Sequence, residues 1–119
     1  IYLFMVGSCV SRMATVTEYD PSNDSWTSKT SAPTARSDAM PALVDGNVYL
    51  IGGYDSNCTN INEMYNIDND SWSTKSSMTY SRNYVKGGVI NNKVYLMGGT
   101  CGGINSDFKC NEVYDHSMD

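Results

Sequence analysis

The chain has 119 residues, enough for one domain, and its 13 acidic residues against 8 lysines and arginines give a formal net charge of −5. This balance, without a basic stripe, argues against binding driven by nucleic-acid phosphates. No apolar run approaches the roughly 18 residues that a membrane-spanning helix needs, so we expect no membrane partner.

The first predicted strand lies at residues 1–5, and the chain begins inside it without an initiator methionine. We therefore expect the chain to have been cut from a longer one. Val6 stands where later copies of the same pattern carry a glycine, so this copy is degenerate. Tyr19 and Trp26 follow, on either side of a Pro-Ser-Asn-Asp sequence that favours a tight turn.

The middle of the chain predicts four strands. The first, Ala39–Val44, contains Pro41, which cannot donate a ladder hydrogen bond and therefore suits the edge of a sheet. The second, Val48–Ile51, is wholly apolar and ends in two glycines, where the backbone must turn or crowd a neighbour. The other two lie near Asn62–Ile67 and around Trp72, and no segment shows helical periodicity.

These elements repeat. Residues 17–53 laid over residues 63–99 without a gap, an offset of 46, match at 13 of 37 positions. Glu112-Val113-Tyr114 resembles Glu63-Met64-Tyr65, although Gly99 precedes Tyr114 by 15 positions and Gly53 precedes Tyr65 by 12, so the last loop is three residues longer. The matching residues include Tyr19, Trp26, Arg36, Gly52 and Gly53 in one copy and Tyr65, Trp72, Arg82, Gly98 and Gly99 in the next.

A four-stranded antiparallel sheet every 46 residues is typical of β-propeller blades. A double glycine, then a spaced Tyr and Trp, with an Arg before the next strand, resembles the kelch repeat. The resemblance implies an all-β fold of kelch-type blades in an incomplete propeller. We expect a partial blade at residues 1–36, a complete blade at 37–82 and a partial blade at 83–119. Because propellers need about four to eight blades, we expect self-association or further blades to close the ring.

The alternation of strand direction sorts the loops between two rims. Short turns share one rim, and the long loops after each double glycine and before each first strand share the other. Long loops on a rigid scaffold commonly carry recognition, and kelch proteins often bind protein ligands there. We therefore expect a protein or peptide partner on the long-loop rim. The candidate contacts are Tyr54, Asp55, Asn57, Asn60, Tyr80, Asn83 and Tyr84.

Two sets of repeated residues have alternative roles. Arg36 and Arg82 are candidate partner contacts that offer a guanidinium to an acidic peptide. Their recurrence in register favours a structural role that ties one blade to the next. The aromatic residues of the motif could form a sugar platform, but their fixed period favours packing between blades. These aromatic residues are Tyr19, Trp26, Tyr65 and Trp72.

The four cysteines form no Cys-x-x-Cys pair, and His116 is the one histidine. We therefore predict neither a metal site nor a cofactor. Cys101 and Cys110 bracket the last long loop, where a disulfide would form in an oxidising compartment. The favoured alternative is four reduced thiols, with the cytoplasm slightly favoured over secretion.

No pattern in the sequence indicates a catalytic group, because a nucleophile–base pair needs a histidine or its equivalent beside a Ser or Cys. We predict a non-enzymatic module for protein–protein interaction. The kelch resemblance further implies a substrate-recruiting adaptor of a ubiquitin ligase, beside a BTB domain. The alternative is part of a carbohydrate-active or extracellular propeller enzyme, of the galactose oxidase or sialic-acid epimerase type.

Overall fold

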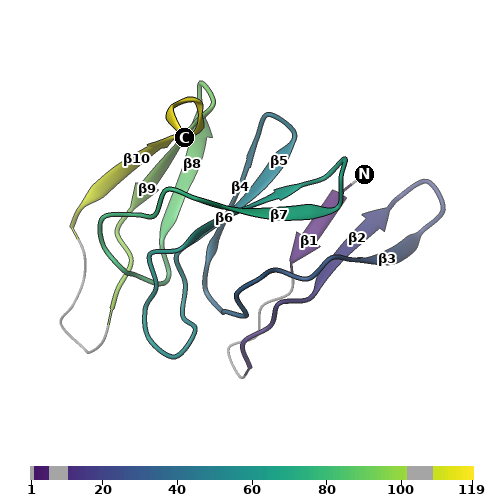
Figure 1. Ribbon diagram of the computed structural model, residues 1–119, viewed down its shortest axis with the longest axis horizontal. Helices are drawn as coiled ribbons and strands as arrows, with labels where there is room; N and C mark the ends of the chain where they lie inside the picture. The colour runs from purple at the N-terminus through teal and green to yellow at the C-terminus, as the bar shows by residue number, and fades with distance from the viewer. Residues whose placement is uncertain (1, 6–10, 102–108) are drawn as a thin grey trace.

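The computed structural model describes residues 2–5, 11–101 and 109–119. In these residues ten strands form three antiparallel sheets that lie side by side (Figure 1). The first sheet has the order β1 (Tyr2–Met5), β2 (Val16–Asp20), β3 (Ser25–Lys29). The second has the order β4 (Met40–Val44), β5 (Asn47–Ile51), β6 (Asn62–Asn66), β7 (Ser71–Lys75). The third has the order β10 (Asn111–Asp115), β9 (Lys93–Met97), β8 (Lys86–Ile90).

The second sheet confirms the predicted four-stranded antiparallel unit. Pro41 lies in β4, at the edge of the sheet, where its missing N–H costs no hydrogen bond within the sheet. Asp45 and Gly46 connect β4 to β5 with positive φ angles of 46° and 72°, as a two-residue hairpin turn requires. Asn91 and Asn92 repeat this turn in the third sheet, with φ angles of 50° and 58°.

One short helical segment departs from the prediction of no helix. The 3₁₀ turn η1 (His116–Met118) follows β10. The Asp115 carboxylate accepts hydrogen bonds from the Ser117 backbone N–H at 3.1 Å and from the Ser117 hydroxyl at 2.7 Å. This turn rests on a local side-chain hydrogen bond, so apolar periodicity did not reveal it.

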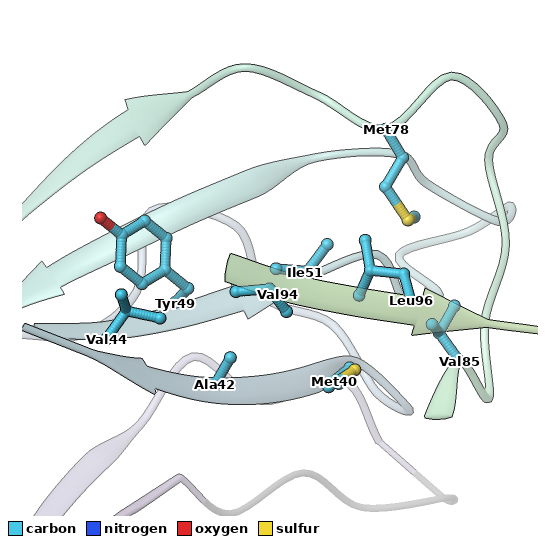
Figure 2. Close-up of a cluster of buried hydrophobic side chains, with 9 residues drawn as sticks. All are labelled: Met40, Ala42, Val44, Tyr49, Ile51, Met78, Val85, Val94 and Leu96. Atoms are coloured by element: carbon cyan, nitrogen blue, oxygen red, sulfur yellow. The ribbon is translucent and has the colours of Figure 1, made fainter. Parts of the chain in front are cut away.

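The hydrophobic core lies between the second and third sheets (Figure 2). Residues at every second position of β4 and β5 point into it, as the pleat of a strand dictates. Within the repeated apolar strand, Ile51 in β5 and Leu96 in β9 are each 1% exposed, whereas Met97, the counterpart of Ile51 at the end of β9, is 48% exposed. The cluster consists of Met40, Ala42, Val44, Tyr49, Ile51, Met78, Val85, Val94 and Leu96.

The double glycine after β5 is explained by crowding on both residues. Gly52 has a φ of +67°, and a Cβ there would lie 2.7 Å from the carbonyl oxygen of Arg82. Gly53 has a φ of +108°, and a Cβ would lie 2.5 Å from the carbonyl oxygen of Ser37. No other residue type fits both the dihedral and the space, which confirms that the pair marks a turn against a neighbouring backbone.

Candidate partner-binding rim

The long loops gather at one end of the three sheets and the short hairpin turns at the other (Figure 1). We call the first end the loop rim: the loops after β5 and β9 (residues 52–61 and 98–101) and the linkers before β4 and β8 (residues 30–39 and 76–85). Ser37 and Tyr54 exchange backbone hydrogen bonds of 3.0 and 2.9 Å. Asn83 and Thr100, 46 residues further on, exchange bonds of 2.9 Å each. Each linker is thus tied to the loop of the blade that it enters.

Further backbone bonds make the loop rim a continuous structure from the second sheet to the third. The Gly53 N–H donates to the Arg82 carbonyl at 3.0 Å, and the Arg82 N–H donates to the Thr59 carbonyl at 3.1 Å. The loop at residues 54–58 closes on itself, since the Thr59 N–H donates back to the Gly53 carbonyl at 2.9 Å. These bonds give the predicted contacts a fixed platform.

Three predicted contacts are exposed tyrosines: Tyr54 is 39%, Tyr80 46% and Tyr84 52% exposed. The backbones of two of them bond to adjacent residues of one linker. The Tyr54 N–H donates to the Ser37 carbonyl, and the Tyr84 N–H donates to the carbonyl of the next residue, Asp38, at 3.2 Å. The 37–38 segment therefore stands between Tyr54 of one blade and Tyr84 of the next.

Tyr84 has an unusual backbone conformation, with a φ of +52°. The equivalent residue of the previous copy, Asp38, has a φ of +55°. Aspartate tolerates this left-handed region, whereas a tyrosine there costs roughly 1–2 kcal/mol. The fold requires this geometry at the position, and in the later copy a strained, exposed aromatic residue occupies it.

The other predicted polar contacts differ in the hydrogen bonds that they make within the chain. Asn57 is exposed, and Asp55 is half-buried, with its carbonyl oxygen accepting a hydrogen bond from the Arg12 guanidinium. The Asn60 amide donates to the Met78 carbonyl at 3.0 Å, which uses that side chain to hold a linker. The Asn83 side chain accepts from the Thr100 hydroxyl at 3.4 Å.

Arg36 and Arg82 are predicted partner contacts that the structure buries, at 3% and 0% exposure. Arg36 donates to the Leu50 carbonyl at 2.7 Å and lies 3.0 Å from the Glu63 carboxylate. Its burial lowers the pKa of the guanidinium, and the nearby Glu63 carboxylate opposes that shift. The Arg36 side chain is already buried within this chain, and any added blade would bury it further. We therefore leave Arg36 out of the proposed surface.

Arg82 repeats this arrangement one blade later. It donates to the carbonyl oxygens of Gly98 at 2.7 Å and Cys110 at 2.9 Å, and pairs with Glu112 at 2.7 Å. Arg36 therefore anchors its linker to β5 and β6, the two middle strands of the second sheet, and Arg82 anchors its linker to β10 and to the residues next to the facing ends of β9 and β10. We leave Arg82 out of the proposed surface for the same reason.

The aromatic residues of the repeat make different contacts in the first two sheets. Tyr65 is fully buried with its ring centroid 5.2 Å from that of Trp72, and the Trp72 indole N–H donates to the Thr30 carbonyl of the first sheet's linker at 2.9 Å. Tyr19 and Trp26 stack similarly, with centroids 5.0 Å apart. Trp26, in contrast, is 58% exposed.

Some functional groups were missed from the sequence although signals were present. Glu63 and Glu112, the acidic partners of the two arginines, stand two residues before the repeated tyrosines. His116 also has an unforeseen partner, since its Nε2 lies 3.0 Å from the Asp45 carboxylate in the β4–β5 turn. Arg12 reaches the rim from the first sheet's loop. The sequence pattern did not indicate a role for Arg12, because the copy of the repeat that contains it is degenerate.

The described cysteines are all free thiols, which includes the bracketing pair Cys101 and Cys110 and also Cys58. Cys9 and Val6 lie outside the described residues. In the part of the chain that the structure covers, no group of three or more His, Cys, Asp or Glu side chains could hold a metal ion. Within the same residues, no helix has both the length and the apolar character to span a membrane.

A cavity of about 290 Å³ lies between the second and third sheets. Its lining includes Asn62, Met78 and Tyr114, but none of the exposed rim tyrosines. This cavity therefore lies apart from the exposed tyrosines of the loop rim.

Comparison with known proteins identifies the repeat. The model of the Kelch motif matches residues 35–79 and 81–119. The solved structure titled "Structure of YjhT" superposes with a TM-score of 0.67 at 24% identity, and the match covers 79% of this chain and 30% of that one. The similarity thus concerns the fold, and this chain spans less than a third of that structure. No curated protein matches the chain. Two motif matches over most of the chain show that it belongs to the kelch-repeat family.

Proposed function

We propose that this chain is a protein-binding module that receives a protein or peptide partner on the loop rim, with Tyr54 and Tyr84 at the centre of the contact. Kelch repeats generally mediate protein interactions, which supports the class of function. The observation that carries the proposal is the strained and exposed Tyr84, whose backbone is bonded beside that of Tyr54 through residues 37–38. Strained residues persist where the surrounding structure holds them, and they cluster at binding sites.

The chemistry of these side chains fits a binding surface. Tyrosine offers a large, rigid contact area together with one hydroxyl group, and it has few rotatable bonds to immobilise on binding. Hydrogen-bonded loops beneath the two rings lower the cost of ordering the surface. Tyr80 and Asn57 extend the contact around the centre. A substrate-recruiting adaptor, which the family resemblance implies, is one use of such a module.

A comparative pull-down tests this proposal. The wild-type chain, a Tyr54→Ala/Tyr80→Ala/Tyr84→Ala variant and a control variant are used as baits in cell extract, and bound proteins are quantified by mass spectrometry. The control, Asp68→Ala/Asn69→Ala, alters exposed residues of the β6–β7 turn on the opposite rim. We expect the proteins enriched on the wild type to remain on the control and to be lost from the tyrosine variant. An unchanged set on the folded tyrosine variant would contradict the proposal.

A further inference from the structure

Arg12 reaches the loop rim next to Tyr54, from the loop between β1 and β2. Its guanidinium donates a hydrogen bond to the carbonyl oxygen of Asp55, the residue that follows Tyr54. The backbone that carries Arg12 is also held, because the Met13 carbonyl oxygen accepts from the Arg36 N–H at 3.3 Å. Both ends of this side chain are therefore fixed at the rim.

The Arg12 guanidinium differs from those of the two buried arginines. Arg36 and Arg82 are enclosed and paired with glutamates of this chain. Arg12 is exposed, and among the described residues it makes the hydrogen bond to Asp55 and no ion pair. A guanidinium carries five N–H donors in a planar fork, which can hold a carboxylate by two parallel hydrogen bonds. Arg12 thus presents its charge and its remaining donors to a partner.

Two lysines add exposed positive charge to the same rim. Lys86 stands two residues after Tyr84, at the first position of β8, and Lys109 stands two residues before β10. Both side chains are exposed. Exposed cations therefore accompany both central tyrosines, with Arg12 at Tyr54 and Lys86 at Tyr84.

The acidic residues of the rim are less available to a partner. Among the described residues of the rim these are Asp38 and Asp55, and both are half-buried. Asp38 accepts a hydrogen bond from the Ser37 hydroxyl at 2.8 Å, and Asp55 accepts one from the Asn57 N–H at 3.3 Å. The charges that the described part of the rim exposes most are therefore positive.

The opposite end of the molecule carries the negative charge of the chain. We call it the turn rim: the short turns after β2, β4, β6 and β8, η1, and the strand ends next to them (Figure 1). Seven aspartates against one lysine, Lys93, give the turn rim a formal charge of −6. Six acidic residues against seven lysines and arginines remain for the rest of the chain, which gives +1. The seven aspartates are Asp20, Asp24, Asp45, Asp68, Asp70, Asp115 and Asp119.

The net negative charge of the chain does not oppose an acidic partner at the loop rim. The two rims are separated by the length of a five-residue strand, about 16 Å. At physiological salt, exposed charges more than about 8 Å apart are largely screened from each other. The exposed cations of the loop rim therefore set the potential that a partner meets there.

We propose that the segment of the partner that contacts the loop rim is acidic, and that Arg12 binds one of its carboxylates next to Tyr54. This inference rests on the proposed function, because it names the chemistry of the partner for the same rim. A basic segment would instead meet the exposed cations and be favoured at the turn rim. Arginine and tyrosine are both enriched among the residues that dominate binding energy, so Arg12 and Tyr54 together suit the centre of a contact.

Selection from a random peptide display library tests the charge of the partner with defined ligands. The library is panned at physiological salt on the wild-type chain and on the folded Tyr54→Ala/Tyr80→Ala/Tyr84→Ala variant. Peptides that the wild type retains and the variant loses are rim binders, and we expect them to contain more Asp and Glu than the input library. Rim binders without this enrichment would overturn the inference and leave the proposed function standing. A selection that yields no rim binders would contradict the proposed function, and the inference with it.

Arg12→Gln measures the charged contact directly. We expect this change to weaken the binding of an acidic rim binder at least about tenfold, as the loss of a hydrogen bond between charged groups does. Arg12→Lys keeps the charge and should restore part of the affinity. Lys93→Gln is the matched control, since it removes a cation from the turn rim and should leave the affinity unchanged.

A second peptide, with Asn and Gln in place of Asp and Glu, separates a contact with the partner from a structural role of Arg12. If Arg12 binds a carboxylate, Arg12→Gln should have little effect on the affinity for this amide peptide, because the two changes remove the same interaction. An equal loss with both peptides would mean that Arg12 acts only by holding its loop at Asp55. That result would overturn the inference.

Discussion

Arg36 and Glu63 form an ion pair of 3.0 Å between the linker before β4 and the middle of β6, with their side chains 0% and 3% exposed. Glu63 also accepts a hydrogen bond from the Thr34 hydroxyl at 2.7 Å, so one carboxylate holds the linker at two points. Removing the charge of Glu63 would leave the buried guanidinium of Arg36 without a compensating negative charge.

We therefore expect Glu63→Gln to lower the free energy of unfolding by about 3–5 kcal/mol, the usual cost of breaking a buried pair. Urea denaturation of the purified chain measures the loss. The control is Glu18→Gln, which removes the more exposed 3.0 Å pair with Lys29 in the first sheet. That change should cost less than about 1 kcal/mol. Equal losses in the two variants would show that burial does not set the strength of the Arg36 pair.

Acid should weaken both the attachment between sheets, which involves Asp70 and Asp119, and the pairing of β9 with β10, where Asp115 bonds to Lys93. Hydrogen bonds from Tyr65 and then Thr30 lower the pKa of Asp70, and those from Ser76 and Tyr114 lower the pKa of Asp119. Lys93 and Ser117 lower the pKa of Asp115 to about 2. Groups with a depressed folded pKa stabilise the fold above their unfolded value, about 3.9, and lose that contribution as the pH falls towards the folded value.

The thermal midpoint should therefore be lower at pH 3 than at pH 5, as followed by circular dichroism. The Asp70→Asn/Asp115→Asn/Asp119→Asn variant removes the three carboxylates that are responsible. Its midpoint should change less between the same two pH values. A wild-type midpoint that stays constant or rises on acidification would contradict this assignment.

Gly53→Ala should be strongly destabilising, because the added methyl group would lie 2.5 Å from the Ser37 carbonyl oxygen at a φ of +108°. We expect a loss of at least about 1–3 kcal/mol in the free energy of unfolding, the range for a residue held in a sparsely populated backbone region. Gly88→Ala is the control, since nothing lies within 4 Å of its added Cβ. That variant should stay within about 0.5 kcal/mol of the wild type.

Tyr84→Asn should separate stability from binding. Asparagine tolerates the φ of +52° better than tyrosine, so the free energy of unfolding should rise by up to about 1 kcal/mol. The same change should weaken partner capture, because the exposed ring is lost. Tyr54→Asn, at a position without positive φ, should weaken capture with no gain in stability. A Tyr84→Asn chain that is no more stable than the wild type would count against the strain assigned to Tyr84.

The blade architecture could be predicted because the repeat places strands, turns and glycines at a fixed period that local chemistry explains. The role of the two arginines could not be predicted, because periodicity shows that Arg36 and Arg82 are equivalent but not whether their side chains point into the sheets or into solvent. Only the three-dimensional approach of Glu63 and Glu112 decides that. Asp24, Asp70 and Asp119 each follow a tyrosine by five residues and accept a hydrogen bond from its hydroxyl. The spacing alone does not predict these bonds, because aspartate is also common in turns.

The loop after Gly99 is three residues longer than the loop after Gly53, yet Tyr114 still donates to Asp119, and Asp119 still accepts from Ser76. The contact between blades therefore does not depend on the length of this loop, because the extra residues lie between the double glycine and the tyrosine. Loop closure costs little more for a modest insertion. Randomised insertions in the loops after Gly53 and Gly99 would therefore give a library of new recognition surfaces on an unchanged scaffold.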